Sequence, residues 1–342
     1  MPDTGGDRLT RRSVLAGMAA GAAMAGAGPL LAETAPLVRR LSPALDRIVA
    51  PDAAVEVIAT GIGWAEGPVW VPAEQMLLFS DPPANLMRRW SRRGGLAPFL
   101  QPSGAAGTDP KLVREPGSNG LAMAHDGALL IANSGGRSLD RVDLRTKQRR
   151  VLVGRYQGKR FNSPNDLTVA RSGAIYFTDP PYGLADGDKS SLKELPHNGV
   201  YRWTEGDEAE LIDGELTRPN GVALSPDERR LYVSVSDEGA PRIMVYDLDA
   251  AGRPRGRRLF LDAKSLSGAG LPDGMKVASN GLLFCSSPGG MYVMTPEAEP
   301  LGLVADGGPI ANCCFGESGA TLFMTGNHRV MRLPLRMNGW HA

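Results

Sequence analysis

The sequence predicts an all-β protein, folded as a six-bladed β-propeller of four-stranded blades. A strand–turn–strand pattern occurs six times, and each copy begins with a polar residue, which stands beside Gly or Pro in five of them. Successive copies begin 39 to 55 residues apart, which leaves room for about four strands in each interval. No long stretch after the N-terminal segment has the periodicity of a helix. Six units of this size fill most of the 342-residue chain.

Each copy is predicted to continue from its first strand through a tight turn into a second strand. Five of these turns contain dipeptides that suit tight hairpins. They are Asp126-Gly127, Ser172-Gly173, Pro226-Asp227, Asn280-Gly281 and Ser318-Gly319. Further strand-like runs, such as 199–203 and 242–247, lie between the copies and complete the predicted blades.

The N-terminal segment differs in composition from the repeats. Arg11 and Arg12 precede a run of small apolar residues over 16–27, and Ala32 ends a plausible cleavage site. This pattern is typical of a twin-arginine signal, so we expect export by the twin-arginine (Tat) machinery to the periplasm or the exterior. The apolar run is shorter than the roughly 20 residues that span a bilayer, so we expect no permanent membrane anchor. The alternative is a disordered leader on a cytosolic protein.

We therefore expect an export signal over residues 1–32, a linker over 33–54 and one propeller domain over 55–342. The chain has 38 basic and 37 acidic residues, a net charge of +1, and no clustered basic patch. This balance argues against a protein that binds nucleic acid. Its 43 glycines and 27 prolines, with 42% hydrophobic residues, indicate a turn-rich globular protein.

The three cysteines do not form a disulfide framework, because their number is odd and two are adjacent. We expect Cys285, Cys313 and Cys314 to be small buried strand residues. A bridge from Cys285 to one of the other two stays open in an oxidising compartment.

Six polar residues occupy the same place in the six copies. They are Glu66, Asn119, Asn165, Asn220, Asp273 and Asn312. The innermost strand of a propeller blade begins beside the central channel, so these residues are predicted to point toward one axis. Carboxylate and amide oxygens without His or Cys favour Ca²⁺, although Mg²⁺, Mn²⁺ or Zn²⁺ could use the same oxygens. The alternative is that Asn and Asp precede Gly only because they cap tight turns.

Other catalytic arrangements are absent from the sequence. There is no Gly-x-Ser-x-Gly nucleophile elbow and no His-Glu-x-x-His zinc motif. His125 and His341 are predicted to be surface groups, whereas His197 and His328 could face an end of the channel.

With these motifs in place, the sequence resembles the gluconolactonase/regucalcin (senescence-marker-protein-like) family of six-bladed propellers. The resemblance spans about residues 55–335 and is carried by AEGPVW, SPNDLTV, IYFTDPPYGL, HNGVYRW, RPNGVALSPD and LPDGMKV. It implies a hydrolase that opens a sugar lactone such as gluconolactone, with a divalent metal as cofactor. The ligands that it implies are Glu66, Asn165, Asn220 and Asp273, although Asn165 contacts the substrate instead in some members.

One position departs from the family pattern. Animal members carry an Arg as a substrate contact two residues before the Asn-Asp step, where this chain has Ser163, with Arg160 nearby. The particular lactone therefore stays open.

The expected chemistry assigns further roles. A metal would polarise the lactone carbonyl and water would attack it, with Asp273 as general base in addition to its contact with the metal. We expect Asn119, Asp166, Tyr182 and Trp64 to be substrate-binding residues of the pocket, and Asp166 could also orient a metal ligand.

Two other functions fit the same sequence. One is a hydrolase of other lactones, aryl esters or organophosphates on the same propeller. The other is a propeller that calcium stabilises and that binds a ligand or partner without turning it over.

Overall fold

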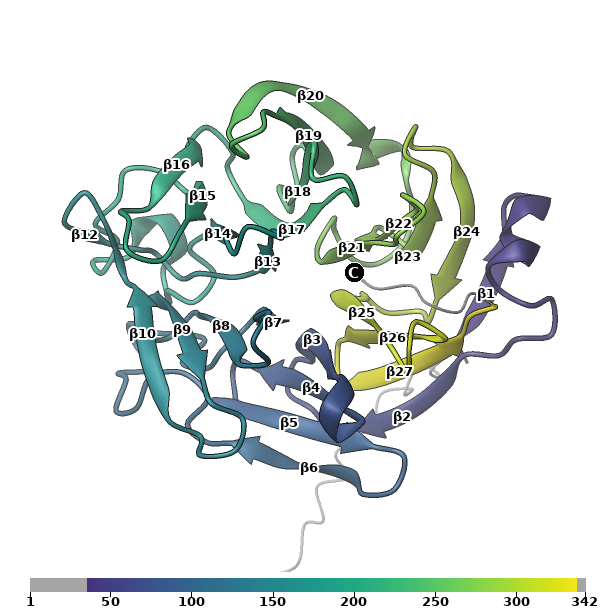
Figure 1. Ribbon diagram of the computed structural model, residues 1–342, viewed down its shortest axis with the longest axis horizontal. Coiled ribbons are helices and arrows are strands. Elements are labelled where there is room, and N and C mark those ends of the chain that lie inside the picture. The colour runs from purple at the N-terminus through teal and green to yellow at the C-terminus, as the bar shows by residue number, and fades with distance from the viewer. Residues whose placement is uncertain (1–35, 337–342) are drawn as a thin grey trace, which may run out of the picture. The chain divides into compact units, whose positions relative to one another are not determined.

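The computed structural model of the protein describes residues 36–336. Six antiparallel sheets are arranged around a central channel, and the strand that opens each of the six sequence copies lies nearest the axis (Figure 1). The predicted six-bladed β-propeller is therefore confirmed, and the described residues contain no α-helix. The predicted export signal over 1–32 lies outside the described residues.

The first three blades follow one another in chain order, each with four strands. Blade 1 contains β3 (Glu66–Val71), β4 (Met76–Asp81), β5 (Leu86–Ser91) and β6 (Gly95–Leu100). Blade 2 contains β7 (Leu121–Met123), β8 (Leu129–Asn133), β9 (Ser138–Val142) and β10 (Arg149–Val153). Blade 3 contains β13 (Leu167–Val169), β14 (Ile175–Asp179), β15 (Gly199–Trp203) and β16 (Glu210–Asp213). A separate hairpin of β11 (Arg155–Tyr156) and β12 (Lys159–Arg160) lies between blades 2 and 3 in the chain.

Of the last three blades, blades 5 and 6 include strands from the N-terminal part of the chain. Blade 4 contains β17 (Pro219–Leu224), β18 (Arg230–Val235), β19 (Arg242–Leu248) and β20 (Pro254–Asp262). Blade 5 contains β21 (Met275–Val277), β22 (Leu283–Ser287), β23 (Gly290–Met294) and β24 (Pro300–Ala305), extended by β1 (Leu37–Arg40). Blade 6 contains β25 (Asn312–Gly316), β26 (Thr321–Gly326) and β27 (Arg329–Pro334), completed by β2 (Glu56–Thr60). Four short 3₁₀ turns cover Pro43–Arg47, Pro72–Glu74, Gly187–Lys189 and Ala263–Ser265.

The ring of blades is closed by the N-terminal strands. β2 pairs antiparallel with β27, so blade 6 combines strands from the two ends of the domain. β1 pairs with β24 and covers the outer edge of blade 5, and Leu45 is buried against the same region. The described part of the predicted linker, residues 36–54, is thus packed onto the propeller instead of extending from it. Pairing of this kind provides hydrogen-bond partners for backbone groups at an open sheet edge. The sequence of one short strand does not reveal which edge it will pair with.

The hydrophobic core is divided into clusters that lie between neighbouring blades. Tyr176 of blade 3, for example, packs with Val222 and Leu231 of blade 4. Trp70 of blade 1 stacks on Phe323 of blade 6, with ring centroids 5.3 Å apart, and so secures the closure of the ring. Burial of these apolar surfaces supplies the main favourable contribution to folding.

The predicted hairpin turns are present. Gly127, Gly173, Gly281 and Gly319 all have positive φ angles. In the turn that contains Pro226-Asp227, Glu228 is the residue that takes the positive φ of 56°.

Glycines that follow the polar residues near the axis serve a different purpose. A Cβ on Gly221 would lie 2.3 Å from the carbonyl oxygen of Asp273, and one on Gly120 would lie 2.7 Å from that of Asn165. Neither glycine has a positive φ. The Asn-Gly steps at these two positions are therefore explained by close approach of adjacent blades, and the turn-capping interpretation does not apply to them.

Cys285, Cys313 and Cys314 are all buried and free, so neither of the disulfides left open by the sequence is present. Among residues 36–336, no helix is long and apolar enough to cross a membrane.

Candidate active site

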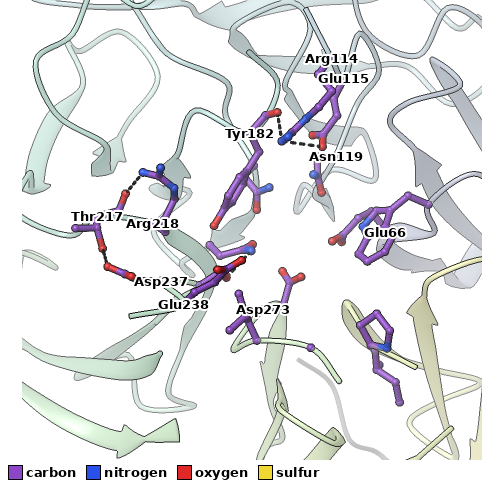
Figure 2. Close-up of a pocket in the computed structure, with 18 of the residues that line it drawn as sticks. Glu66, Arg114, Glu115, Asn119, Tyr182, Thr217, Arg218, Asp237, Glu238 and Asp273 are labelled. Carbon is purple, nitrogen blue, oxygen red and sulfur yellow. Dashed lines mark hydrogen bonds and ion pairs between the residues drawn. The ribbon is translucent and has the colours of Figure 1, made fainter. Parts of the chain in front are cut away.

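A cavity of about 900 Å³ opens where the innermost strands begin, at one end of the central channel. Figure 2 shows Glu66, Asn119 and Asp273 around one shared space, with Tyr182 beside them. Of the eight predicted site residues, seven line this cavity. They are Trp64, Glu66, Asn119, Asn165, Tyr182, Asn220 and Asp273. The common register of the copies therefore brings side chains that are far apart in the sequence into one site.

Hydroxyl groups of neighbouring blades hold the backbone at this end of the channel. In three places a Ser or Thr on the second strand of one blade donates a hydrogen bond to the backbone carbonyl of a cavity residue in the next blade. The pairs are Ser80–Asn119 at 2.7 Å, Thr178–Asn220 at 2.6 Å and Ser234–Asp273 at 2.7 Å. Because all three hydroxyls are fully buried, these bonds fix the position of each cavity residue relative to the preceding blade.

Negative charge accumulates on the axis. Burial raises the pKa of Glu66 to about 7, and the charge of Asp166 adds to the shift, although the Gly67 amide donates to the Glu66 carboxylate at 2.9 Å. Burial also raises the pKa of Asp273, with further contributions from Glu66 and Asp166. Three mutually repelling carboxyl groups in one buried site are stabilised most directly by a cation.

The oxygen atoms available in the cavity fit a hard divalent cation. Asp273 Oδ1 is buried and has no hydrogen-bond partner among the described residues. Asn220 donates its amide nitrogen to Ser236 Oγ at 2.9 Å, which leaves its carbonyl oxygen for another interaction. Within residues 36–336, no three His, Cys, Asp or Glu side chains converge in a metal-binding arrangement. An ion here would thus need amide oxygens in addition to Glu66 and Asp273, a ligand set that Ca²⁺ or Mg²⁺ accepts.

Two of the predicted polar residues lie deeper than the cavity. Asn312 Nδ2 is 3.4 Å from Asp166 Oδ2, and both residues are only 2% exposed. The expected contact between Asp166 and a substrate is therefore not supported by the geometry. Consecutive residues at the start of a strand point in different directions, so Asn165 lines the cavity while Asp166 turns inward and affects it through its charge.

Ser163 has a structural role in place of the Arg of animal members. Its hydroxyl donates to Pro180 O at 2.6 Å and accepts from Gly183 N at 2.9 Å, which ties down the loop that carries Tyr182. Arg160, the nearby basic residue, donates to Gly136 O and lines a separate groove on the outside of blades 2 and 3. Neither residue lines the axial cavity.

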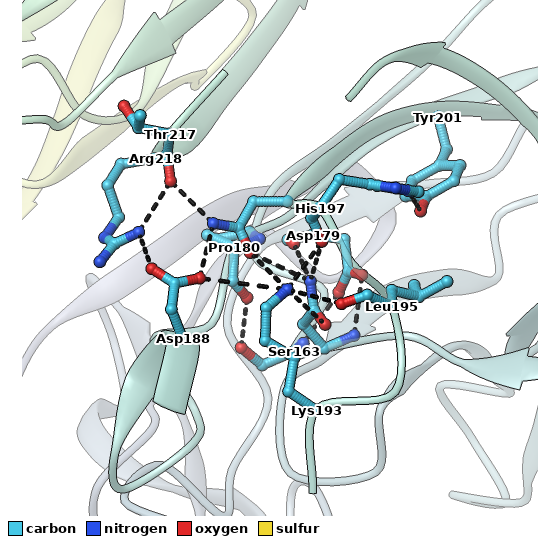
Figure 3. A network of polar contacts seen from close by, with 12 residues as sticks. Ser163, Asp179, Pro180, Asp188, Lys193, Leu195, His197, Tyr201, Thr217 and Arg218 are labelled. Atoms are coloured by element: carbon cyan, nitrogen blue, oxygen red, sulfur yellow. Dashed lines mark hydrogen bonds and ion pairs between the residues drawn. The ribbon is translucent and has the colours of Figure 1, made fainter. Parts of the chain in front are cut away.

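A buried polar network supports the segment that leads to Asn165 (Figure 3). The Asp179 carboxylate accepts hydrogen bonds from the backbone amides of Asn162 and Ser163, at 2.7 and 2.8 Å. Lys193 Nζ donates to Asn162 Oδ1 at 3.3 Å and to the carbonyl of His197 at 2.8 Å. Burial raises the pKa of Asp179 to about 7. These contacts fix the backbone that places Asn165 on the axis.

The three histidines among residues 36–336 take no part in the cavity lining. His197 Nε2 lies 2.8 Å from the Tyr201 hydroxyl, and His328 Nδ1 lies 2.8 Å from Ile62 O. His125 is at the far end of the inner strands. His341 lies outside the described residues.

Several lining residues were not predicted, because they come from loops that do not repeat. They are Arg114, Glu115, Asp188, Thr217, Arg218, Ser236, Asp237 and Glu238. A Gly/Pro-rich insertion before the second copy was a signal for a long loop, but nothing in it indicated that the loop reaches the axis.

Comparisons with known proteins agree with this architecture. Residues 64–328 match the family model described as the SMP-30/Gluconolactonase/LRE-like region. A gluconolactonase from Zymomonas mobilis subsp. mobilis is 48% identical over 326 residues, covering 93% of this chain and 92% of that protein. A lactonohydrolase from Aspergillus oryzae is 27% identical, covering 81% of this chain and 69% of that protein.

Solved structures give the same result. A gluconolactonase from Xanthomonas campestris superposes with a TM-score of 0.76 at 33% identity, covering 88% of this chain and 97% of that one. A regucalcin from Agrobacterium tumefaciens, described as a calcium-binding protein, has a TM-score of 0.66 at 18% identity, covering 84% and 95%. The second likeness concerns the fold alone.

Proposed function

The chain belongs to the SMP-30/gluconolactonase/LRE-like family, and from that premise we propose that it is a metal-dependent hydrolase that opens a sugar lactone such as gluconolactone. Lactone hydrolysis is supported by its relatives, which are named gluconolactonase and lactonohydrolase. The observation that carries the metal is the buried group of carboxylate and amide oxygens at the base of the cavity, with Asp273 Oδ1 left without a partner.

In the proposed reaction, water adds to the carbonyl carbon of the lactone. The bond between that carbon and the ring oxygen then breaks, and the ring oxygen takes up a proton to become the hydroxyl of an open-chain hydroxy acid. Asp273 is the proposed general base that accepts the proton of the attacking water, because it lines the cavity and its Oδ1 has no hydrogen-bond partner among the described residues. The described residues that line the cavity include no Ser or Cys paired with a histidine base, so water is the preferred nucleophile.

Glu66, Asn165, Asn220 and Asp273 are the residues that would hold the cation, most simply Ca²⁺. A bound divalent cation would supply Lewis acidity that polarises the lactone carbonyl and stabilises negative charge on its oxygen. The cavity residues themselves orient the lactone and exclude bulk water on the side of the central channel.

Proton release during hydrolysis tests this proposal. We would measure it with glucono-1,5-lactone and a panel of other lactones, using chelator-treated protein and the same protein reloaded with Ca²⁺, Mg²⁺, Mn²⁺ or Zn²⁺. We expect activity to disappear on chelation and to return with one or more of these ions. Hydrolysis that is unaffected by chelation would refute the metal dependence, and no hydrolysis of any lactone would refute the proposed reaction.

The same panel separates the two other functions. Phenyl acetate and paraoxon would be preferred substrates if the chain were mainly an aryl-ester or organophosphate hydrolase. A non-catalytic propeller would be stabilised by Ca²⁺ in thermal unfolding and would turn over none of the compounds.

We also propose that the protein is exported through the twin-arginine route. Support comes from the paired Arg11-Arg12 and the small apolar run that follows them. Expression of the full chain with cell fractionation tests this: Arg11→Lys combined with Arg12→Lys is expected to keep the protein in the cytoplasm. Equal export of both forms would contradict it.

A further inference from the structure

Two loops from different blades are joined by hydrogen bonds beside the cavity. The first, residues 102–118, connects blade 1 to blade 2, and the second follows β14 in blade 3. Val113 and Leu184 form an isolated antiparallel bridge between them. Arg114 reinforces it: its amide donates to Gly183 O at 2.8 Å and its guanidinium to Tyr182 O at 2.6 Å. The two loops therefore form one wall of the site, and they position Glu115 beside Tyr182 (Figure 2).

This wall presents polar atoms that have no partner. Glu115 Oε2 is buried and has no hydrogen bond among the described residues, and only 18% of the side chain is exposed. The other oxygen, Oε1, forms an ion pair with Arg114 Nη2 at 3.7 Å, which is beyond hydrogen-bond distance, and Arg114 Nη2 donates to Tyr182 O. A buried acceptor without a partner costs about 1–3 kcal/mol, so its retention beside a ligand cavity calls for a ligand that satisfies it.

The Tyr182 hydroxyl is a second polar group of this kind. It is buried and has no hydrogen-bond partner among the described residues. Burial raises the pKa of Tyr182, and the nearby Ser236 hydroxyl opposes that shift. Ser236 Oγ donates to Pro272 O at 2.5 Å and accepts from the Asn220 amide at 2.9 Å. Tyr182 therefore adds to the cavity lining a hydroxyl that can both donate and accept.

The opposite wall differs in this respect. Thr217 Oγ1 donates to Asp237 Oδ2 at 2.5 Å, and Arg218 pairs with Asp188. These four side chains therefore satisfy one another.

We propose that Glu115 is a specificity-determining residue that accepts hydrogen bonds from the ring hydroxyls of the substrate, with the Tyr182 hydroxyl as a second donor and acceptor in the same cavity. The proposal rests on the function proposed above. A carboxylate is an acceptor only, so it pairs with hydroxyl groups and has nothing to bond on a lactone that lacks them. Sites that hydrogen-bond a substrate hydroxyl discriminate strongly against analogues without it, because the buried protein group then stays unpaired.

A comparison of two lactones with the same ring tests the assignment. We would measure kcat/KM of the metal-loaded enzyme for glucono-1,5-lactone and for δ-valerolactone, which has no hydroxyl groups. Glu115→Gln is expected to lower kcat/KM at least tenfold for the hydroxylated lactone, mainly through KM, and less than twofold for δ-valerolactone. Tyr182→Phe should shift the same ratio by about threefold. Glu297→Gln, an exposed glutamate on blade 5, is the matched control and should change neither value.

Equal losses on both lactones, or no loss on either, would overturn the assignment. Binding of 1,5-anhydro-D-glucitol, which has the hydroxylated ring but no bond to hydrolyse, gives a readout independent of turnover. Calorimetry on the metal-loaded protein should show at least tenfold weaker binding in Glu115→Gln. If the wild type hydrolyses no lactone but this difference is found, the proposed function fails and the role of Glu115 stands. Unchanged binding would refute that role.

Discussion

The two ends of the innermost strands have opposite chemistry. Where the strands begin, the cavity contains the buried carboxylates Glu66 and Asp273 with the amides of the ring. Where they end, a separate cavity of about 500 Å³ is lined mainly by apolar residues such as Met123 and Val169. Lys276, three residues after Asp273 on the same strand segment, is a cation at that second end. The same repeat therefore builds both ends, and only one of them gathers uncompensated negative charge.

The two ends also differ in how their residues are held. At the first end, buried hydroxyls such as Thr178 Oγ1 bond the backbone of the next blade. At the second end, Thr168 lies on the cavity wall and apolar packing dominates. A reactive site needs fixed positions for its polar groups, and hydrogen bonds between blades provide them where the metal and substrate are proposed to bind.

The largest difference between the ends is expected in catalysis. Asp273→Asn removes the proposed base and one negative charge, and we expect kcat/KM for glucono-1,5-lactone to fall at least about a thousandfold. Lys276→Met at the other end should change it less than threefold. Steady-state kinetics with the metal-loaded proteins measures both. Similar losses in the two variants would show that the whole channel, and not one end, supports the reaction.

A second difference is expected in the response of stability to pH. The pKa of Asp179 is raised from 3.8 to about 7, so the folded state keeps a proton between pH 4 and 7 that the unfolded state has released. This proton favours folding at low pH, and its contribution is lost as pH rises through that range. The unfolding free energy of the wild type minus that of Asp179→Asn should therefore fall by about 2–4 kcal/mol from pH 4 to 7 and stay constant above it.

Urea denaturation at a series of pH values measures this difference. Asp126→Asn, at the exposed hairpin near the other end, is the control and should give no such decrease over the same range. Parallel curves for the wild type and Asp179→Asn would contradict the raised pKa.

A smaller effect is expected from the hydroxyls that join the blades. Thr178→Val removes the bond to Asn220 O and leaves that carbonyl without its donor, so the free energy of unfolding should fall by about 1–2 kcal/mol. Activity should fall several-fold, because Asn220 loses an anchor. Thr168→Val, the same change at the other end, should alter stability by less than about 0.5 kcal/mol. Chemical denaturation and kinetics on both variants measure this difference between the two ends. Equal destabilisation of the two variants would contradict it.

The smallest effect is expected at His125. Its ring nitrogen lies 3.0 Å from Ala170 O beside the apolar cavity, far along the strand from the carboxylates. His125→Ala should change kcat/KM less than twofold at pH 7. A marked loss of activity would place a functional group at the end that we consider structural.

Much of the fold and part of the site could be predicted from the repeat. Alternation of strand residues and the turn dipeptides gave six blades, because side-chain direction in a strand follows sequence position. Register then placed Glu66, Asn165, Asn220 and Asp273 at one end of the axis. These are local patterns, and each blade repeats them.

Features without a repeat could not be predicted in this way. The N-terminal strand β1 was expected to be linker, but it pairs with β24, more than 250 residues away in the sequence. Asp166 was expected to contact the substrate, but it turns inward to Asn312. Glu115 was not predicted at all, because its position depends on a bridge between loops of two blades.

The sequence by itself determined the number of blades, the position of the polar residues in each and the membership of a known family. Only the tertiary structure decided which of those residues face the cavity, which lie behind it and which loops complete the wall. The reason is physical: strand periodicity and turn geometry are set by neighbouring residues, whereas burial, charge repulsion and unsatisfied hydrogen bonds arise between segments that meet only when the ring of blades is closed.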